Sequence, residues 1–385
     1  MVPRLKRLTV LLSMSTPRSL LCQRNIDDAM TTRQLIDLEN TRRERRWLEK
    51  HHPLRQLFWE CTLRCNLSCR HCGSDCRKEA AVPDMPLEHF IAVLDDVATM
   101  TAPSSVLVNT VGGEPLVRPD IVECGRAITS RGFLWGFVTN GVLLTESLLS
   151  ELLDAGLRTV AVSLDGLEAE HNWLRGNSYV GAMNAIRLLA GTRNLLWDVI
   201  TCVNQRNIAT LPELKRTLIA AGVKKWRIFT IFPQGRARLN DELFLSPEQY
   251  AGLMEFIVAT RKTGEINLSY SCEGFLGDYE GRVRNHIYRC DAGTMTASVL
   301  ASGDITGCMS IRSHYAQGNI YRDRFSDVWN NRFEAMRKRK WMKRDECARC
   351  KAWDWCAGGP FHLRGDNGEM LHCNYQALCS ASSQK

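Results

Sequence analysis

The sequence lacks any apolar run long enough to span a membrane, which would need about 20 consecutive apolar residues. Residues 8–14 (LTVLLSM) follow two basic residues as in a signal peptide. The run is short, however, residues 15–18 (STPR) interrupt it, and no convincing cleavage site follows. We therefore expect no membrane partner, and we interpret Met30 as a candidate for the true start of translation.

The sequence also lacks a strong imbalance of charge. Its 50 Lys and Arg residues and 42 Asp and Glu residues leave a net charge of +8, and the basic residues are scattered apart from one run at 332–344 (RFEAMRKRKWMKR). We interpret this run as the solvated face of a helix, with binding of an acidic peptide or nucleic acid as the alternative. A nucleic-acid partner is not expected.

Cysteine, by contrast, is abundant, with 16 residues in 385. The cysteines cluster in C-x2-C and C-x3-C spacings instead of being spread as loop staples. In a chain of this size, that pattern favours metal binding over disulfides, and hence a reducing, cytoplasmic location.

The chain is long enough for a large and a smaller domain, and its composition of 44% hydrophobic and 24% charged residues is that of a globular protein. We divide it into an extension at 1–50, partly disordered and partly helical, an α/β domain at 51–240 and a cysteine-rich domain at 241–385. In the α/β domain we predict strands at 56–59, 105–110, 132–138, 159–163, 196–203 and 225–231. We predict helices at 87–100, 120–130, 145–155, 179–191 and 211–220.

Strands that alternate with helices predict a parallel sheet, either curled into part of a barrel or doubly wound. In both architectures ligands bind at the carboxyl ends of the strands. After residue 239 one further helix is predicted at 246–262, with Ser246 as its N-cap and Pro247 in its first turn. The cysteine-rich remainder has little regular periodicity, and we expect it to fold around metal.

Cys65, Cys69 and Cys72 form a C-x3-C-x2-C triplet just after the first strand. Three thiolates at this spacing can hold three irons of a [4Fe–4S] cluster and leave the fourth iron open for a small molecule. The alternatives are buried free thiols or a zinc knot, for which Cys76 or His71 could supply the fourth ligand.

Polar motifs follow the next strands in order. Gly112-Gly113-Glu114-Pro115 combines two glycines, which let a ligand approach the backbone, with a carboxylate that can accept hydrogen bonds from an ammonium group. The later strands end in residues 139–141 (TNG), 163–166 (SLDG) and 201–204 (TCVN), and Arg175 can pair with a carboxylate. Each motif alone can be turn chemistry, but their order on successive strands is specific.

With these motifs the chain resembles a radical S-adenosylmethionine (radical SAM) enzyme over residues 56–235. The resemblance implies a partial (β/α)6 TIM-type barrel in which Cys65, Cys69 and Cys72 ligate a [4Fe–4S] cluster that binds SAM. It places His71 beside the adenine, Gly112, Gly113, Glu114 and Pro115 at the SAM amino group, Ser163 and Asp165 near the ribose, and Arg175 at the SAM carboxylate. One electron, from a reductant such as flavodoxin or ferredoxin, would cleave SAM to methionine and a 5′-deoxyadenosyl radical that abstracts hydrogen from substrate.

The C-terminal cysteines resemble the SPASM extension, which holds one or two auxiliary [4Fe–4S] clusters. The resemblance assigns Cys347, Cys350, Cys356 and Cys373 to the outer cluster, and Cys290 and Cys308, with Cys272 as a further candidate, to the inner one. Pro360 stands where the pattern has another cysteine, so the inner cluster lacks a ligand. The cluster would then either be open to substrate or take His362 or Cys379 as the replacement ligand. We interpret His362 first as a satisfied structural histidine, and a zinc ribbon remains the alternative for the outer four cysteines.

The resemblance implies a peptide or protein substrate, and maturation of a ribosomally made peptide is the favoured function. The first alternative is an anaerobic sulfatase maturase forming formylglycine, which would need a carboxylate base. Asp278 is available for that role, although an exposed turn residue is the simpler interpretation. The second alternative is a non-catalytic iron–sulfur or zinc protein that binds a partner.

Overall fold

The computed structural model describes residues 30–271 and 273–383. Its centre is a single sheet with the strand order β10-β9-β8-β1-β2-β3-β4-β5-β6-β7. The strands are β1 (Gln56–Thr62), β2 (Leu107–Gly112), β3 (Leu134–Thr139), β4 (Leu157–Ser163), β5 (Leu196–Val203), β6 (Lys225–Thr230), β7 (Asn267–Tyr270), β8 (Thr296–Val299), β9 (Asp304–Thr306) and β10 (Gly318–Asn319). Neighbours from β1 to β7 pair in parallel, and the sheet ends at β7 and β10 without closing. The predicted partial barrel is confirmed.

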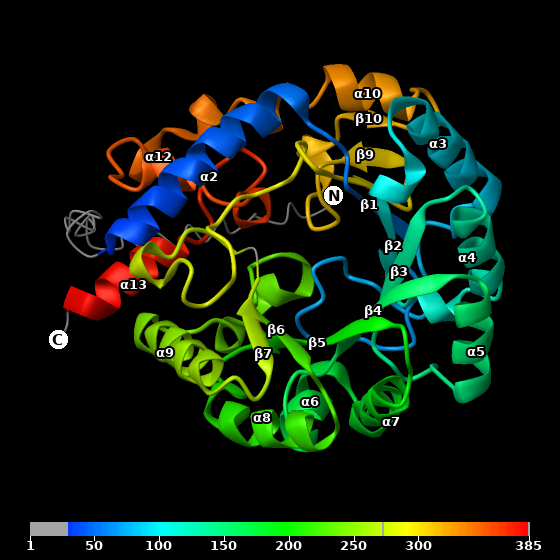
Figure 1. The fold of residues 1–385 in the computed structure, drawn as a ribbon, viewed down its shortest axis with the longest axis horizontal. Coiled ribbons are helices and arrows are strands. Elements are labelled where there is room, and N and C mark those ends of the chain that lie inside the picture. Colours follow the sequence, from blue (N-terminus) through cyan, green and yellow to red (C-terminus); the bar gives the residue numbers. More distant parts are fainter. Residues whose placement is uncertain (1–29, 272, 384–385) are drawn as a thin grey trace, which may run out of the picture.

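Helices follow the strands along the chain and cover the outside of the curved sheet (Figure 1). They are α3 (Leu87–Met100), α4 (Ile121–Thr129), α5 (Glu146–Asp154), α6 (Glu168–Arg175), α7 (Tyr179–Ala190), α8 (Leu211–Ala220) and α9 (Pro247–Thr263). All six predicted strands and all six predicted helices are present, most of them within two residues of the predicted bounds. The short helix α6, which carries Arg175, was not predicted.

Large side chains fill the space between sheet and helices. Trp59 on β1 is fully buried and stacks on Phe90 of α3 with ring centroids 4.2 Å apart. Trp135 on β3 faces Gly125 of α4, where a Cβ atom would lie 2.1 Å from the indole ring. The missing side chain at Gly125 therefore lets helix and strand approach closely. This packing fixes the register of the strands, and with it the positions of the residues at their carboxyl ends.

The C-terminal part of the chain joins the same sheet. β7 pairs with β6 in parallel, β8 pairs with β1 in parallel, and the hairpin of β8 and β9 is antiparallel. The remaining helices are α10 (Phe325–Asn331), α11 (Glu334–Arg337), α12 (Trp353–Cys356) and α13 (Asn374–Ser383). These pairings bring the cysteine-rich segment against the first strand of the barrel. The division at residue 240 stays a prediction.

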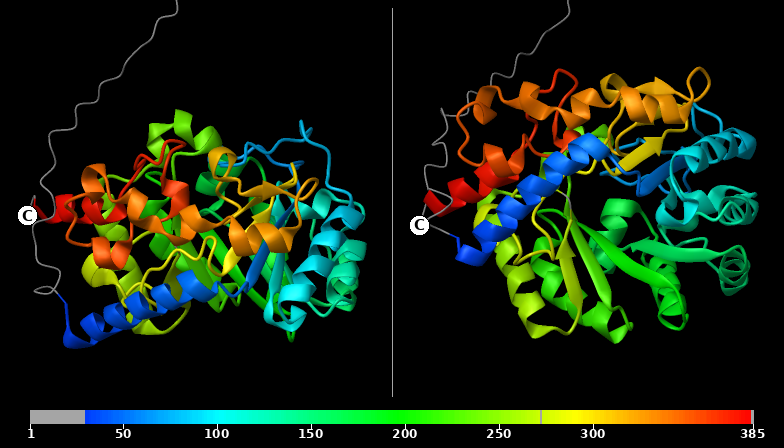
Figure 2. Two further views of the ribbon diagram at one scale, coloured as in Figure 1. Left: turned by 90° about the horizontal axis from the view of Figure 1, so that it is seen from above. Right: turned by 45° about the horizontal axis from the view of Figure 1, so that its top comes forward.

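The N-terminal helix α2 (Thr32–His51) begins with a capping box between Thr31 and Gln34. It runs alongside the C-terminal segment in both Figure 1 and Figure 2. Gln34 Nε2 donates to the backbone oxygen of Asp278 at 3.0 Å, and Arg45 donates to that of Trp355 at 3.0 Å. The helix therefore braces the cysteine-rich segment. The signal-peptide-like run at 8–14 and the other residues before Met30 lie outside the described residues, and Met30 as the start of translation stays a prediction.

Across residues 30–271 and 273–383, no helix combines the length and the apolar character needed to cross a membrane.

The basic run at 332–344 does not form the predicted solvated helix face. It is divided between α11 and a 3₁₀ helix at Arg339–Met342, and both Arg337 and Arg339 are buried. Arg337 donates to the Gly293 carbonyl at 2.7 Å, and Arg339 donates to carbonyls that include that of Cys290 at 3.1 Å. The prediction of a solvated face was wrong for these two arginines because carbonyl groups from distant segments satisfy their guanidinium groups. The other basic residues of the run are exposed, namely Arg332, Lys338, Lys340, Lys343 and Arg344.

Candidate functional site

The Cys65/Cys69/Cys72 loop begins at the carboxyl end of β1 and is held by the backbone that follows β2. Gly113 N donates to the Thr62 carbonyl at 2.8 Å, and Glu114 N donates to the Arg64 carbonyl at 3.0 Å. A Cβ atom on Gly113 would lie 2.0 Å from the Arg64 carbonyl oxygen. The glycines of the second motif are thus needed because the cysteine loop lies directly against them.

Cys65, Cys69 and Cys72 all line one cavity of about 510 Å³ at the carboxyl ends of the strands. Burial raises the pKa of Cys65 to about 11, whereas hydrogen bonding from Cys76 lowers the pKa of Cys72 to about 5. In the described residues no three cysteine sulfur atoms lie within 4.8 Å of one another. Tetrahedral zinc with 2.3 Å bonds would hold thiolates about 3.8 Å apart. The wider spacing suits a four-iron cube better than a zinc knot.

Glu114 does not line this cavity, although Gly112 and Gly113 do. Its carboxylate is buried and accepts hydrogen bonds from Thr139 Oγ1 at 2.7 Å, Asn140 N at 2.7 Å and Leu116 N at 3.2 Å. Burial raises the pKa of Glu114 to about 7, against the lowering effect of these bonds. These bonds tie the second motif to the third, and the hydrogen bond from an ammonium group to Glu114 stays a prediction. Pro115 is likewise buried outside the cavity lining.

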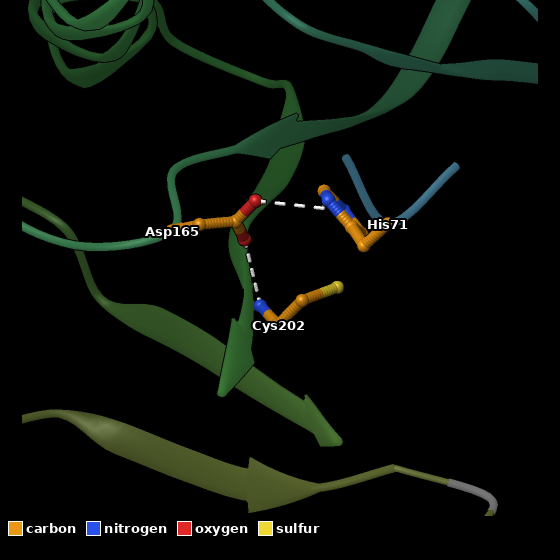
Figure 3. Close-up of side chains that lie close together, drawn as sticks. All are labelled: His71, Asp165 and Cys202. Atoms are coloured by element: carbon orange, nitrogen blue, oxygen red, sulfur yellow. Dashed lines mark hydrogen bonds and ion pairs between the residues drawn. The ribbon is translucent and has the colours of Figure 1, made fainter. Parts of the chain in front are cut away.

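Asp165, Arg175 and His71 form a polar cluster beside the loop. Figure 3 shows the Asp165 carboxylate between the His71 ring and the backbone nitrogen of Cys202. Arg175 Nε donates to Asp165 Oδ2, and Arg175 also lies 3.9 Å from Cys69 Sγ and 3.4 Å from His71 Nε2. Asp165 Oδ1 accepts from Cys202 N at 2.7 Å. Burial opposes ionisation of Asp165, but the positive charge of Arg175 holds its pKa below the ordinary value. Since Arg175 and a backbone amide already occupy this carboxylate, the cluster is an ion-pair network.

The structure places Ser163, Arg175 and His71 in the cavity lining and Asp165 behind Arg175. His71 Nδ1 is buried and has no hydrogen-bond partner among the described residues. Burial lowers the pKa of His71 to about 4, so the ring is neutral at physiological pH. His71 therefore presents a neutral aromatic ring on the cavity wall, and its position beside an adenine stays a prediction.

Arg236, which the sequence analysis missed, clamps the cysteine loop from the segment after β6. Its guanidinium donates to the carbonyls of Cys69 at 2.7 Å and Cys76 at 2.9 Å, and it pairs with Asp75 at 2.7 Å. The neighbouring Gly235 has positive φ, and a Cβ atom there would lie 2.4 Å from the Cys72 carbonyl oxygen. The signal was available, because a Gly-Arg pair follows the sixth strand at the position where the other motifs occur.

The C-terminal segment supplies the remaining wall of the same cavity, which the sequence did not predict. It contributes Met309, Ser310, Ile311, Arg312, Tyr315, Phe361, His362, Arg364 and Asp366. Arg312 pairs with the buried Glu60 of β1 and donates to Ser74 beside the cysteine loop. The two halves of the chain are thus joined at the cavity.

His362 is 9% exposed, and its ring lies 4.8 Å from that of Phe232, which also lines the cavity. Burial lowers its pKa to about 4, and Nε2 has no hydrogen-bond partner among the described residues. The interpretation as a satisfied structural histidine is therefore not supported. Ligation of a cluster by His362 stays a prediction.

The outer four cysteines gather around one small cavity lined by Cys347, Cys350, Cys356 and Cys373. Cys290 and Cys308 are not part of this group, while Cys290 and Cys379 both border the apolar cluster of Phe275, Tyr288 and Tyr375. Cys272 lies outside the described residues. Asp278 is half exposed in a turn and does not line the main cavity.

Comparison with known proteins identifies the chain. The sequence model of the radical SAM superfamily matches residues 59–218, and that of the SPASM iron–sulfur cluster-binding domain matches residues 290–351. The mycofactocin maturase MftC of Mycolicibacterium smegmatis is 30% identical over 311 residues, covering 79% of this chain and 77% of that protein. The chain belongs to the radical SAM superfamily. It is an enzyme that uses SAM and [4Fe–4S] clusters, and the non-catalytic alternative is wrong.

Other radical SAM proteins are similar over most of the chain. A protein named AdoMet-dependent heme synthase from Methanosarcina barkeri is 29% identical over 349 residues, covering 84% of this chain and 97% of that protein. Among solved structures, Streptococcus suis SuiB bound to its precursor peptide SuiA has a TM-score of 0.66 at 17% identity, covering 88% of this chain and 80% of that one. The structure of anSMEcpe with bound AdoMet has a TM-score of 0.65 at 19% identity, covering 86% and 92%. At these identities the two structures establish the fold.

Proposed function

We propose that this radical SAM enzyme matures a ribosomally made peptide. The cluster and SAM, when bound, supply a one-electron cleavage that yields methionine and a 5′-deoxyadenosyl radical able to abstract hydrogen from the substrate. The protein's own residues hold the cofactors, orient them and exclude water from the cavity.

In this proposal Cys65, Cys69 and Cys72 ligate the cluster, because these three thiols line the cavity at the C-x3-C-x2-C spacing. Cys76 lines the cavity as well, and its backbone N–H donates to Cys72 Sγ at 3.4 Å. Gly112 and Gly113 offer backbone groups to the SAM amino group, since their side-chain-free surface lines the cavity. The Glu114 carboxylate fixes the turn at Asn140 and makes no direct contact.

Arg175 Nε holds Asp165, and its two terminal nitrogens, which lie 3.9 Å from Cys69 Sγ and 3.4 Å from His71 Nε2, are the donors that we assign to the SAM carboxylate. Ser163 faces the cavity as a partner for the ribose, and Asp165 positions Arg175 from behind. His71 packs beside the adenine as a neutral ring. These roles use each group in the state and orientation that the structure gives it.

For the auxiliary centres, we propose that Cys347, Cys350, Cys356 and Cys373 hold the outer cluster, as supported by their arrangement around one cavity. Cys290 and Cys308 hold the inner cluster. Pro360 stands in this chain where the SPASM pattern has a further cysteine ligand for that cluster. An acidic electron carrier such as flavodoxin or ferredoxin supplies the electron.

The observation that carries the peptide assignment is the composite cavity. Tyr315, Phe361 and His362 from the C-terminal segment face the cysteine loop across it, and His362 presents a buried polar atom without a partner among the described residues. A cavity closed on one side by aromatic and hydrogen-bonding groups suits a side chain and amide of a peptide. The relative MftC, named a maturase, supports this choice.

The test uses the anaerobically reconstituted enzyme with SAM, dithionite and a short peptide encoded beside its gene. We expect 5′-deoxyadenosine to form together with a stoichiometric change in peptide mass. If SAM cleavage proceeds but peptides encoded beside the gene stay unchanged, the peptide assignment is wrong and the radical SAM chemistry is not.

A second candidate substrate is an iron porphyrin, as the relatives named heme synthase and Fe-coproporphyrin III synthase indicate. The favouring observation is the charge of the cavity, which is lined by five arginines and one aspartate: Arg175, Arg236, Arg238, Arg312, Arg364 and Asp366. Among the described residues, no carboxylate lies within 4.0 Å of Arg238 or Arg364, so neither charge is neutralised by an acidic side chain. Arg364 is buried and donates to the carbonyls of Gly358 and Gly368, so it would attract ligand carboxylates through its charge. If this candidate is right, iron coproporphyrin III offered in place of the peptide should change in mass as 5′-deoxyadenosine forms.

A further inference from the structure

Arg70, Trp173 and Arg206 form a cationic surface patch on the outer side of the cysteine loop. The guanidinium carbons of Arg70 and Arg206 each lie 4.8 Å from the centroid of the Trp173 ring. Arg70 Nε also donates to the Trp173 carbonyl at 2.9 Å, and Arg70 N donates to the Leu174 carbonyl at 2.8 Å. We call these three residues the Trp173 patch.

Both arginines of the Trp173 patch are exposed, and in the described part of the chain no carboxylate lies within 4.0 Å of either guanidinium. Other arginines around the loop have acidic partners, such as Arg175 with Asp165 and Arg236 with Asp75. The indole holds the two uncompensated charges in place, which reduces the entropy cost of binding an anionic surface.

The patch lies next to the cluster ligands but outside the substrate cavity. Arg70 directly follows Cys69, so their Cα atoms are about 3.8 Å apart. Cys69 lines the cavity, whereas Arg70, Trp173 and Arg206 do not. An electron can therefore enter from the patch while substrate and SAM occupy the opposite side of the loop.

We propose that the Trp173 patch is the docking site for an acidic flavodoxin that reduces the radical SAM cluster. An aromatic ring flanked by two cations complements an exposed flavin edge surrounded by carboxylates, and charge complementarity raises the rate of encounter. One electron passes from the reduced flavin to the cluster for each SAM cleaved, and the flavin is oxidised by one electron. This inference rests on the SAM-cleaving function proposed above.

The test compares two reductants with the same full-length, anaerobically reconstituted enzyme. Release of 5′-deoxyadenosine is measured with dithionite, and separately with flavodoxin, flavodoxin reductase and NADPH. For the Arg70→Glu/Arg206→Glu variant we expect kcat/KM for flavodoxin to fall about tenfold at low salt, with a weaker salt dependence. The dithionite-driven rate should stay within about twofold of wild type, since a small reductant needs no docking surface.

The single variant Arg206→Glu separates loss of docking from damage to the cysteine loop, because the Arg206 guanidinium makes no hydrogen bond to the described residues. We expect about a threefold fall with flavodoxin for this variant. The control is Arg158→Glu, an exposed residue near the start of β4, at the opposite end of the strands. It should leave both rates unchanged.

The proposal is overturned if flavodoxin drives the double variant as fast as wild type, or if wild type works with dithionite and ferredoxin but not with flavodoxin. If dithionite-reduced wild type releases no 5′-deoxyadenosine, the SAM-cleaving function fails and the docking site fails with it. A fall that is equal with both reductants also refutes the patch, because it shows damage to the cluster.

Discussion

Arg175 is expected to have two separable roles, as the counterion of Asp165 and as a ligand for the SAM carboxylate. Asp165 is fully buried and the Arg175 side chain is 12% exposed, so the pair is nearly desolvated. Removing one partner of a buried pair typically costs 3–5 kcal/mol, roughly, because the other charge is left uncompensated. We therefore expect Arg175→Met to lower the free energy of unfolding by about 3–5 kcal/mol.

The double variant Asp165→Asn/Arg175→Met removes both charges. The amide oxygen that this variant carries at position 165 can still accept the hydrogen bond that Cys202 N now donates to the carboxylate. We expect its stability to return to within about 1 kcal/mol of wild type, because no buried charge is then left uncompensated. SAM affinity should not return, because the donors of Arg175 are absent in both variants. The expected loss is at least about tenfold, from one charge-assisted hydrogen bond of 1.5–3 kcal/mol, roughly.

The assays are anaerobic thermal unfolding, equilibrium binding of SAM, and 5′-deoxyadenosine release with dithionite. Asp165→Asn alone serves as the control, since Arg175 then keeps its donors. If the double variant binds SAM as tightly as wild type, Arg175 is only a counterion and its assignment to the SAM carboxylate is refuted. If Arg175→Met is as stable as wild type, the ion pair contributes nothing.

Three further predictions concern Glu114, Gly113 and Cys356. The pKa of Glu114 is about 7 in the folded chain and 4.5 in the unfolded chain, so the folded chain binds this proton more tightly. The resulting contribution to the free energy of unfolding is fully present below pH 4.5 and is lost as the pH rises through 7. Thermal unfolding should therefore show wild type losing roughly 1–3 kcal/mol relative to Glu114→Gln between pH 5 and pH 8, and a constant difference would contradict the assignment. Gly113→Ala should abolish cluster incorporation, measured as iron content, because its Cβ would overlap the Arg64 carbonyl. The matched Gly252→Ala, in open space on α9, should keep full iron content and gain about 0.5–1 kcal/mol of stability. Cys356→Ala should remove about four irons per chain while dithionite-driven 5′-deoxyadenosine release continues, and unchanged iron content would show that Cys356 is not a ligand.

The barrel and the order of its motifs could be read from the sequence because both follow from local patterns. Short β-rich runs located the strands, and segments with helical periodicity located the helices between them. In a parallel sheet the polar residues after successive strands must meet at one edge. The Cys65/Cys69/Cys72 triplet and the glycines at 112 and 113 carry their meaning in short spacings. This part of the site needed no tertiary information.

The role of Glu114 could not be predicted in the same way. Its carboxylate could bind either a ligand or the protein, and the bonds to Thr139 and Asn140 join residues about 25 positions apart. The same is true of Arg337 and Arg339, whose partners are carbonyls of remote segments. A charged residue in a sequence does not reveal which distant backbone groups will satisfy it.

The sequence by itself determined the chemistry of the cysteine loop, because ligand type and spacing are local properties. Only the tertiary structure decided what faces that loop. The parallel pairing of β8 with β1 brings Arg312 to Glu60 and places His362 and Arg364 on the cavity wall. These contacts join residues more than 200 positions apart, and they exist because the open edge of β1 must pair with another strand. The wall of the cavity that faces the cysteine loop therefore depends on the pairing of β8 with β1, which no local sequence pattern determines.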